Sequence, residues 1–562
     1  MKNQSLLRIN RMLQAALLVL GSFALSSLGA TTRAPGAESP SEDDWWLPAW
    51  SQPLPGRISF YGAAPAGFAE PGPELKVYLR WKDVNPADGV YDWSALEKAL
   101  ATATRPIYMR FEHSHVEHVP QWIATKYPEL AAQLLHSDPY KDNFGQSLSG
   151  SFYRPWHPGL ESEFVELMQE FQRRRFANHP RFAFMYFPGL WEWGEYSVQF
   201  VDEMVASGMT PQDYLDWNQR MIDTYVAAFG PGNAHKLMYT QLDYLPLTGG
   251  RADWTSAIGR KPFAYAVSKG VSVRFGLFEK YDFLTGDMPE YGVHPVVDWN
   301  GTRRFGIDES TPLMRAGRQR WIATENEEWG NSNIPVSSYH QLKMTALRTL
   351  SLRANLVFTN QRVWQGAPAL HEYLRRSIGK SVAESADAWA VLRDGRDQYQ
   401  EWSKYPSLGY RGQWRTRNWE RWLYQKDVQP GGMTFPAYRS DSPVPFNNDA
   451  YEAIRTDAAS GNRYIYFDVD DRFISGNASD YYVKVTYLDD AVFKWNIHYM
   501  GTAGTLRGTS LVNNVGDGKW KTATFTIRGS VANNLLKGGS DIRINAGSAG
   551  SLTVRFVRVV KM

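Results

Sequence analysis

The sequence predicts an α/β fold, a (β/α)8 TIM barrel followed by an all-β sandwich domain. Short apolar runs alternate with helical patterns through the first two thirds of the chain, which is typical of βα units that build a parallel sheet. From about residue 434 the pattern changes to strict alternation of apolar and polar residues, as in half-buried strands. A chain of 562 residues is also too long for one ordinary core.

Eight short apolar runs are interpreted as the barrel strands. Eight βα units with insertions fit one barrel, which we assign, together with its connector, to residues 57–432. A charged helical stretch from about residue 367 and a strand at 418–428 complete this region. The helices are expected at 94–103, 160–178, 211–229 and 338–352. The strands are expected at 57–61, 75–81, 106–111, 182–187, 236–241, 271–278, 321–325 and 354–360.

Residues 433–562 are expected to form the β-sandwich. Several short alternating segments, separated by clusters of Gly and Asn and without helices between them, indicate an all-β domain. Trp495 and Trp520 belong to these segments, and we interpret them as core aromatics rather than as an exposed platform for a sugar. No candidate catalytic residue lies here, so a chain that ends near Gly432 is expected to keep an active barrel.

The N-terminus has the order of a secretory signal peptide. Basic residues precede an apolar stretch, residues 12–28, which ends in small residues before an expected cleavage near Ala30. We assign residues 1–30 to the signal peptide and 31–56 to a polar, Pro-rich leader. A membrane anchor is the alternative, but Gly and Ser interrupt the apolar stretch, which is short for a span. The expected location is therefore periplasmic or secreted, as for an exported bacterial protein.

Composition limits the partners of the chain. A formal net charge of +3 argues against a nucleic-acid partner, and no later segment is apolar enough to span a bilayer, so we expect no membrane partner after signal cleavage. Aromatic residues make up 14% of the chain, with 22 Trp, and flat apolar faces suit sugar rings. Arg80, Arg110 and Arg154 hint at an anionic polymer. Without cysteine the chain has no disulfide framework.

Carboxylates follow the fourth and the seventh expected strands, among tryptophans. Cleavage of a glycosidic bond needs one protonated carboxyl group and one ionised carboxylate. Barrel active sites lie at the carboxyl ends of the strands, where Glu195 and Glu325 are expected. The sequence therefore predicts these two as the catalytic pair. Glu192 is a rival for Glu195, and Glu327 is a rival for Glu325 because the two share a strand face.

Three segments carry a family resemblance: Trp81 to Pro86 with Gly89 to Trp93, Trp193-Gly194-Glu195-Tyr196, and Thr324-Glu325-Asn326-Glu327 before Trp329-Gly330. They resemble retaining (β/α)8-barrel glycoside hydrolases with an acid/base after strand four and a nucleophile after strand seven, including β-galactosidase-like bacterial polysaccharide hydrolases. The resemblance covers about residues 57–365 and implies hydrolysis with retention. Many members have Asn directly before the acid/base, where this chain has Gly194. The C-terminal part is similar to the carbohydrate-binding-like modules of such hydrolases, which implies sugar binding.

Two other classes of function remain open. The third strand ends near Glu112, His113, His115 and His118, and this cluster could serve a metal-assisted hydrolase or a polysaccharide lyase. Strong ligand-spacing motifs are missing, so we expect no metal and no organic cofactor. The chain could also be a non-catalytic carbohydrate-binding protein whose barrel has lost one carboxylate.

The expected partner is a polysaccharide or oligosaccharide substrate at the carboxyl ends of the barrel strands. Polar and aromatic residues near these ends are the candidates for contact with its sugar units. The expected substrate-binding residues are Arg80, Trp81, Arg110, Glu112, His113, His115, Trp191, Glu192, Trp193, Gln241, Tyr244, Glu327, Asn360 and Trp364.

Overall fold

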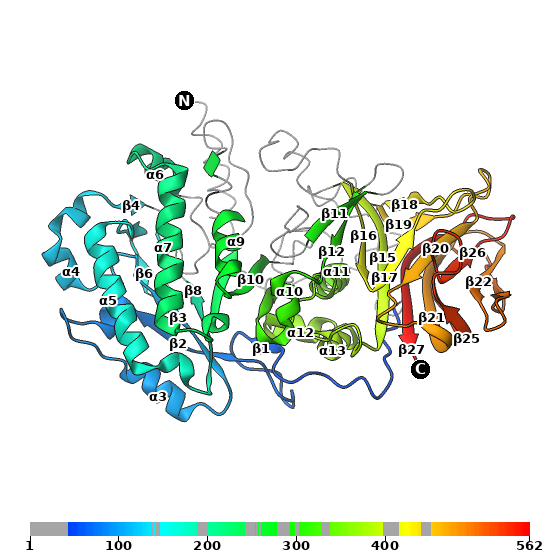
Figure 1. Ribbon diagram of the computed structural model, residues 1–562. Coiled ribbons are helices and arrows are strands. Elements are labelled where there is room, and N and C mark those ends of the chain that lie inside the picture. The colour runs from blue at the N-terminus through cyan, green and yellow to red at the C-terminus, as the bar shows by residue number, and fades with distance from the viewer. Residues whose placement is uncertain are drawn as a thin grey trace, which may run out of the picture. The chain divides into compact units, whose positions relative to one another are not determined.

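The computed structural model contains a nearly closed barrel of eight parallel strands and two largely antiparallel sheets (Figure 1). The structure describes residues 43–136, 139–141, 146–187, 200–241, 253–254, 257, 260–277, 293–297, 303–326, 338–396, 415–439 and 451–562. The expected signal peptide, residues 1–30, lies outside this part. Within it, no helix is long and apolar enough to cross a membrane.

All eight barrel strands expected from the sequence are present in one sheet. Each strand is parallel to its neighbour, in the order β1-β14-β13-β10-β9-β8-β3-β2. The expectation of eight strands is therefore confirmed. The strands are β1 (Ile58–Phe60), β2 (Glu74–Arg80), β3 (Ile107–Glu112), β8 (Phe182–Phe187), β9 (Leu237–Gln241), β10 (Ser272–Leu277), β13 (Ile322–Asn326) and β14 (Leu356–Thr359).

Single hydrogen bonds, rather than a β-ladder, join the two ends of this sheet. The amide of Gly72, just before β2, donates to the carbonyl of Ile58 in β1 at 2.5 Å, and the Ser59 hydroxyl donates to the carbonyl of Pro73. A Cβ atom at Gly72 would lie 3.0 Å from the backbone of Ile58. Glycine thus allows the chain before β2 to approach β1 this closely.

The helices beside the barrel follow the apolar patterns of the sequence. α5 (Pro158–Arg174) buries one apolar face and ends at Arg175, which has a left-handed φ of 57°. α7 (Pro211–Phe229) begins at a capping box between Thr210 and Asp213. The other two expected helices are α3 (Ser94–Thr102) and α11 (Ser338–Ser351). Further helices are α2 (Trp81–Val84), α4 (Gln121–Lys126), α6 (Val201–Ala206), α9 (Arg260–Ser268), α10 (Pro312–Ala316), α12 (Gln361–Gly366) and α13 (Pro368–Ser377).

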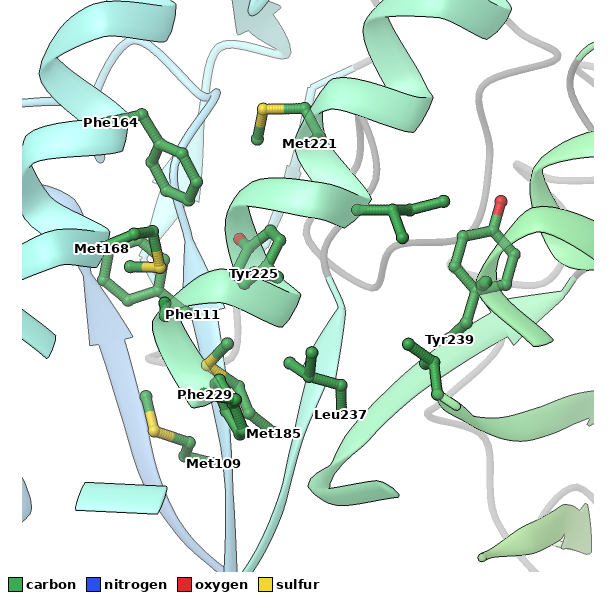
Figure 2. Close-up of a cluster of buried hydrophobic side chains, with 14 of the residues drawn as sticks. Met109, Phe111, Phe164, Met168, Met185, Met221, Tyr225, Phe229, Leu237 and Tyr239 are labelled. Carbon is green, nitrogen blue, oxygen red and sulfur yellow. The ribbon is translucent and has the colours of Figure 1, made fainter. Parts of the chain in front are cut away.

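The two faces of each barrel strand carry different parts of the core. In β3, Met109 and Phe111 face the helices and join an apolar cluster with Phe164 of α5 (Figure 2). Tyr108 belongs to the inner face, where its ring stacks on Phe184 with 4.8 Å between centroids. The interior of the barrel is therefore packed with side chains and is not a pore.

The larger antiparallel sheet has nine strands, and it takes two of them from the chain between β10 and β13. Its order is β11 (Val293–Val297), β12 (Arg303–Ile307), β16 (Arg415–Arg421), β15 (Asp387–Arg396), β19 (Tyr451–Arg455), β27 (Thr553–Lys561), β21 (Gly476–Asp489) and β25 (Lys519–Ala532), with β18 (Phe435–Arg439) beside β19.

The smaller sheet has six strands and shares a core with the larger one. One apolar cluster contains Val483 of the nine-stranded sheet and Ile497 of the six-stranded sheet. Trp495 is fully buried in this cluster and Trp520 is 5% exposed, so both are core aromatics as expected. The smaller sheet has the order β17 (Leu423–Lys426), β20 (Tyr464–Val469), β26 (Ile542–Asn545), β22 (Lys494–Met500) and β23 (Leu506–Gly508), with β24 (Val512–Asn513) beside β22.

Five strands of these sheets precede residue 433, where the sequence pattern placed the start of the sandwich. They are β11, β12, β15, β16 and β17. β15, which was expected in a helical stretch, pairs with β27 at the end of the chain. Pairing between such distant segments leaves no trace in local periodicity, which explains the difference.

The helices α11 and α13 and the nine-stranded sheet also share a core. Phe556 of β27 lies in the same apolar cluster as Tyr373 of α13. The leader adds Trp45 to this cluster, with its ring centroid 5.9 Å from that of Phe556, and its Asp43 accepts a hydrogen bond from Lys343 of α11 at 2.8 Å. The barrel and the C-terminal sheets are thus joined by buried contacts.

A chain that ends at Gly432 is therefore expected to lose its folded barrel, contrary to the expectation from the sequence alone. The deletion removes β27 and with it Phe556, and loss of one large buried aromatic side chain typically costs about 3–5 kcal/mol. Thermal unfolding of the shortened and the full chain, followed by circular dichroism, measures the effect. A soluble shortened chain with one cooperative transition close to that of the full chain would contradict the shared core.

Candidate active site

Glu325 lies inside the barrel near the carboxyl end of β13. All five residues of this strand are buried, and Glu325 is 3% exposed. Ala323, two residues earlier, belongs to the inner apolar cluster, so Glu325 faces the same side. Its backbone pairs with Phe358 of β14 and with Leu277 of β10. All eight strands are parallel, so their carboxyl ends meet at this end of the barrel.

Two side chains hold the carboxylate of Glu325. Arg274 of the neighbouring β10 forms an ion pair with Oε2, and Tyr61, directly after β1, donates its hydroxyl hydrogen to Oε1. Burial by itself raises the pKa of this carboxyl group. The charge and hydrogen bond of Arg274, the hydrogen bond of Tyr61 and the charge of Arg110 outweigh burial, so the net pKa lies below the ordinary value of glutamate. Glu325 is therefore ionised at neutral pH.

The ring of Tyr186 contacts both arginines of this site. The guanidinium carbon of Arg110 lies 4.7 Å from the ring centroid, and that of Arg274 lies 5.3 Å from it. Both guanidinium groups are almost completely buried. A desolvated cation–π contact contributes up to about 2 kcal/mol, so the ring helps to hold the two cations beside the carboxylate.

An aromatic layer lies next to this group of charges inside the barrel. Tyr186 packs against Phe358 with 5.8 Å between ring centroids, and Tyr108 packs against both of these rings at 5.5 Å. Phe184 completes the layer beside Tyr108. This packing closes the barrel on the inner side of Glu325, so a ligand must approach from the carboxyl end.

Glu112, the last residue of β3, is a second buried carboxylate at this end. Its Oε2 lies 2.8 Å from Nδ1 of His118, and both side chains are at most 2% exposed. His115 is also buried, where its Nδ1 accepts a hydrogen bond from the amide of Glu117 at 3.1 Å and its ring meets Phe152 edge-on. Glu112 and the two histidines thus form a buried polar region beside the barrel mouth.

His113 faces the other way from Glu112, because successive residues of a strand point to opposite sides. Its ring meets Phe164 of α5 at 4.9 Å between centroids. Burial lowers the pKa of His113 to about 3, so the imidazole is neutral. His113 therefore belongs to the layer that faces the helices and not to the group around Glu325.

Two of the expected aromatic contacts also lie in apolar clusters outside the barrel interior. Trp81 is 1% exposed and meets Phe164 edge-on at 5.5 Å. Trp364 is 9% exposed and stacks on His371 with 4.9 Å between centroids. Both tryptophans are packing residues in this structure.

Two expected polar residues have local partners. Arg80 forms an ion pair with Asp83, with 2.6 Å between Nε and Oδ2. Asn360 is the N-cap of α12, and its side chain accepts a hydrogen bond from the amide of Val363 at 2.9 Å. Since Arg80 faces a carboxylate and the charge of Arg110 acts on Glu325, these two arginines do not support an anionic substrate.

The remaining sequence-based candidates lie at or beyond the edge of the described residues. Gln241 ends β9, and its backbone pairs with Phe275 of β10. Those outside the described residues are Trp191, Glu192, Trp193, Glu195, Tyr244 and Glu327.

Within the described ranges, no three His, Asp or Glu side chains form a group that could hold a metal ion. The alternative of a metal site at the end of β3 needs about three ligands. His113 contacts Phe164 of α5, whereas Glu112 pairs with His118, so the residues singled out in the sequence do not form one group.

Sequence reasoning missed Arg274, Tyr61 and Tyr186. For Arg274 a signal existed, because it is the single charged residue of an otherwise largely apolar strand. A buried guanidinium group needs a counter-charge. The identity of that counter-charge depends on which strands are neighbours, and this follows only from the sheet order.

No protein-family model matches the sequence, and no curated protein is found to be similar to it. Among solved structures, the chain is similar to an isomalto-dextranase of Arthrobacter globiformis T6 at 11% identity over 76% of this chain and 77% of that chain, with a TM-score of 0.21. A monomeric β-xylosidase of Caulobacter crescentus CB15 matches at 11% identity over 91% and 100%, with a TM-score of 0.20.

The C-terminal CBM6 of the laminarinase LamC from Zobellia galactanivorans matches at 13% identity over 25% of this chain and 93% of that chain, with a TM-score of 0.15. These neighbours are thus glycoside hydrolases and a carbohydrate-binding module. Likeness at such TM-scores does not establish a function for this chain.

Replacement of Arg274 by methionine is expected to destabilise the chain at neutral pH. A buried charge that loses its partner costs about 3–5 kcal/mol. In the native chain, the lowered pKa of Glu325 contributes stability above the unfolded pKa of about 4.3, and this contribution is lost as the pH falls through the folded pKa. In the variant, burial dominates and raises the pKa of Glu325. The free-energy cost of burying an unpaired carboxylate then disappears once acid protonates the group.

Denaturant unfolding of Arg274→Met and the native chain from pH 7 to pH 4 measures this difference. The difference in the free energy of unfolding between Arg274→Met and the native chain should become smaller toward pH 4. Arg274→Met combined with Glu325→Gln is the matched control, since a neutral amide needs no cation, and it should recover part of the loss at pH 7. A gap that stays constant with pH and is unchanged in the double variant would refute the ion-pair account.

Proposed function

We propose that the chain is an exported glycoside hydrolase that cleaves O-glycosidic bonds of a polysaccharide or oligosaccharide with retention. Glu325 is the nucleophile and Glu195 the acid/base. The observation that carries the proposal is the position of Glu325, a buried carboxylate held by Arg274 and Tyr61 at the carboxyl end of the seventh barrel strand. A nucleophilic carboxylate must carry its charge when the substrate binds.

The order of the barrel strands supports Glu195 as its partner. The chain continues into the segment with Glu192 and Glu195 directly after β8 ends at Phe187. β8 is the fourth barrel strand and is parallel to β13, so both strands end on the side where Glu325 lies. Burial beside Trp191 and Trp193 would raise the pKa of an acid/base carboxyl group, as its role requires.

The reaction has two steps. Glu325 attacks the anomeric carbon while Glu195 donates a proton to the leaving oxygen, so the glycosidic bond breaks as a glycosyl ester forms. Glu195 then takes a proton from water, whose oxygen displaces Glu325 and restores both groups. Tyr61 and Arg274 orient the attacking oxygen atoms of Glu325. The two steps need no cofactor.

The other regions have supporting roles in this proposal. The N-terminal signal peptide directs export, and the C-terminal sheets form a carbohydrate-binding-like sandwich. The buried contacts through Phe556 and Trp45 support a fixed attachment of this sandwich to the barrel.

The role of Glu325 is tested by Glu325→Ala, after a panel of polysaccharides with mass spectrometry of the products has identified the substrate. Loss of a nucleophile should lower kcat by about three orders of magnitude or more. Added azide should restore turnover of an aryl glycoside and give a glycosyl azide of inverted configuration, because azide takes the place of the missing carboxylate. Glu327→Gln is the matched control and should stay active. Full activity of Glu325→Ala, with loss in Glu327→Gln, would move the nucleophile to Glu327.

The acid/base is assigned by comparing Glu195→Ala with Glu192→Ala. General acid catalysis contributes about 10²–10⁴-fold where the leaving group is poor. Glu195→Ala should therefore lose this factor on a natural glycoside and little on a dinitrophenyl glycoside, and azide should give a glycosyl azide of retained configuration. If Glu192→Ala shows this behaviour and Glu195→Ala does not, the role belongs to Glu192.

A further inference from the structure

A cleft of about 510 Å³ lies in the outer layer of the barrel, away from Glu325. Its walls come from three segments: the turn around Glu129, the chain from Arg154 to Pro158 that enters α5, and residues 207–213 that lead into α7. Pockets that bind small ligands commonly measure about 300–1,000 Å³, so one or two sugar rings fit this volume.

The cleft lies at the same end of the barrel as Glu325. α5 follows β3 and α7 follows β8, and a helix that follows a barrel strand begins beyond the carboxyl end of that strand. None of the residues that hold Glu325 lines the cleft. It is therefore a separate site on the side from which substrate would approach.

Arg154 supplies hydrogen-bond donors to the cleft. Its Nη1 donates to Oε1 of Gln133 at 2.7 Å, while its buried Nε has no hydrogen-bond partner. In the part of the chain that the structure describes, no carboxylate lies within ion-pair distance of Arg154. The buried Nδ1 of His157 likewise has no hydrogen-bond partner. Both atoms are enclosed by the protein, whereas the bond from Arg154 to Gln133 is exposed and the side chain of His157 is 25% exposed, so a ligand would meet the outer nitrogen atoms of these two side chains.

Two carboxylates supply the acceptors. Glu129 is 57% exposed, and its Oε1 lies 3.4 Å from Nε2 of His157. Asp213 accepts hydrogen bonds from the amide and hydroxyl of Thr210 at 2.9 and 2.6 Å, and it also lines the cleft. The lining thus combines one guanidinium and one imidazole with two carboxylates, and both carboxylates would repel an anionic ligand. A sugar hydroxyl both donates and accepts, so it matches such a mixed set.

Trp156 provides an apolar surface in the same cleft. Its indole is partly exposed and meets Trp217 edge-on with 5.9 Å between centroids, which fixes its orientation. The flat face of an aromatic ring suits the apolar C–H face of a pyranose. Leu130 and Met209 add further apolar lining.

We propose that this cleft is a second carbohydrate site, which binds a neutral saccharide unit between Trp156, Arg154 and Glu129. The site holds sugar outside the reaction centre, at the same end of the barrel. The choice of a saccharide as ligand rests on the proposed function. The cleft itself does not, since it shares no residue with the group around Glu325.

The test uses the full chain with Glu325→Gln, so that no sugar is cleaved. Isothermal titration calorimetry with cellohexaose, laminarihexaose, maltohexaose and xylohexaose measures binding of neutral sugars, and hexagalacturonate serves as the anionic probe. Arg154→Met and Trp156→Ala are each added to Glu325→Gln, and Trp50→Ala, at a tryptophan that is 49% exposed and does not line the cleft, is the matched control. Thermal unfolding confirms that each variant is folded, and Arg154→Met keeps the test valid if Trp156→Ala unfolds.

At least one neutral hexasaccharide should bind the chain with Glu325→Gln alone. Its affinity should fall at least tenfold when Arg154→Met or Trp156→Ala is added, but not when Trp50→Ala is added. Because every chain carries Glu325→Gln, binding at the reaction centre is common to all and the difference belongs to the cleft. Binding that depends little on salt is expected of a neutral ligand. Equal affinities in all variants, no neutral binding, or salt-sensitive preference for hexagalacturonate would each overturn the proposal. Failure of the native chain to cleave any polysaccharide, with the cleft binding intact, would instead overturn the proposed function.

Discussion

The buried ion pair between Arg274 and Glu325 is the interaction on which the carboxyl end of the barrel depends. A carboxylate that is 3% exposed remains ionised only if other interactions offset the free energy of its lost hydration. The guanidinium group of Arg274 on the neighbouring strand provides such an interaction. The pairing of β10 with β13 brings the two residues together, and a register shift between Arg274 and Leu277 marks the place. Such an irregularity locally changes the twist of a strand and the direction of its side chains. The irregularity of the strand and the buried ion pair therefore occur at the same place in the sheet.

The aromatic layer links this pair to the barrel core. Tyr186 contacts both arginines with one ring and packs on Phe358 and Tyr108 in the interior. The cations cannot move far without disturbing that packing, so the same rings that fill the barrel also orient the carboxylate. The proposed nucleophile is thus positioned by the core itself. The proposed saccharide cleft is different, since its lining lies outside the barrel strands and shares no residue with the group around Glu325, so its specificity can vary independently of the reaction centre.

Much of the barrel could be predicted from sequence because its strands are short apolar runs and most of them alternate with helical patterns, which is typical of a parallel sheet. Glu325 was predicted for a related reason, since it ends such a run. Arg274 was missed because its partner lies on a neighbouring strand. The pairing of distant strands could not be predicted, since β11, β12 and β15 join a sheet that also contains β27 at the far end of the chain. The periodicity of a sequence predicts where a strand lies. It does not predict which strands pair with it, because those can come from distant parts of the chain.

In the proposed reaction Glu325 forms a covalent bond to the sugar, and the direct test is to trap that bond. A 2-deoxy-2-fluoro glycoside of the substrate sugar with a good leaving group slows the second step, so the glycosyl ester accumulates. Mass spectrometry of the intact chain, followed by peptide mapping, should then find one fluorosugar on the peptide at Glu325. A label on Glu327 or Glu195, or an unlabelled chain that releases product of inverted configuration, would contradict the account.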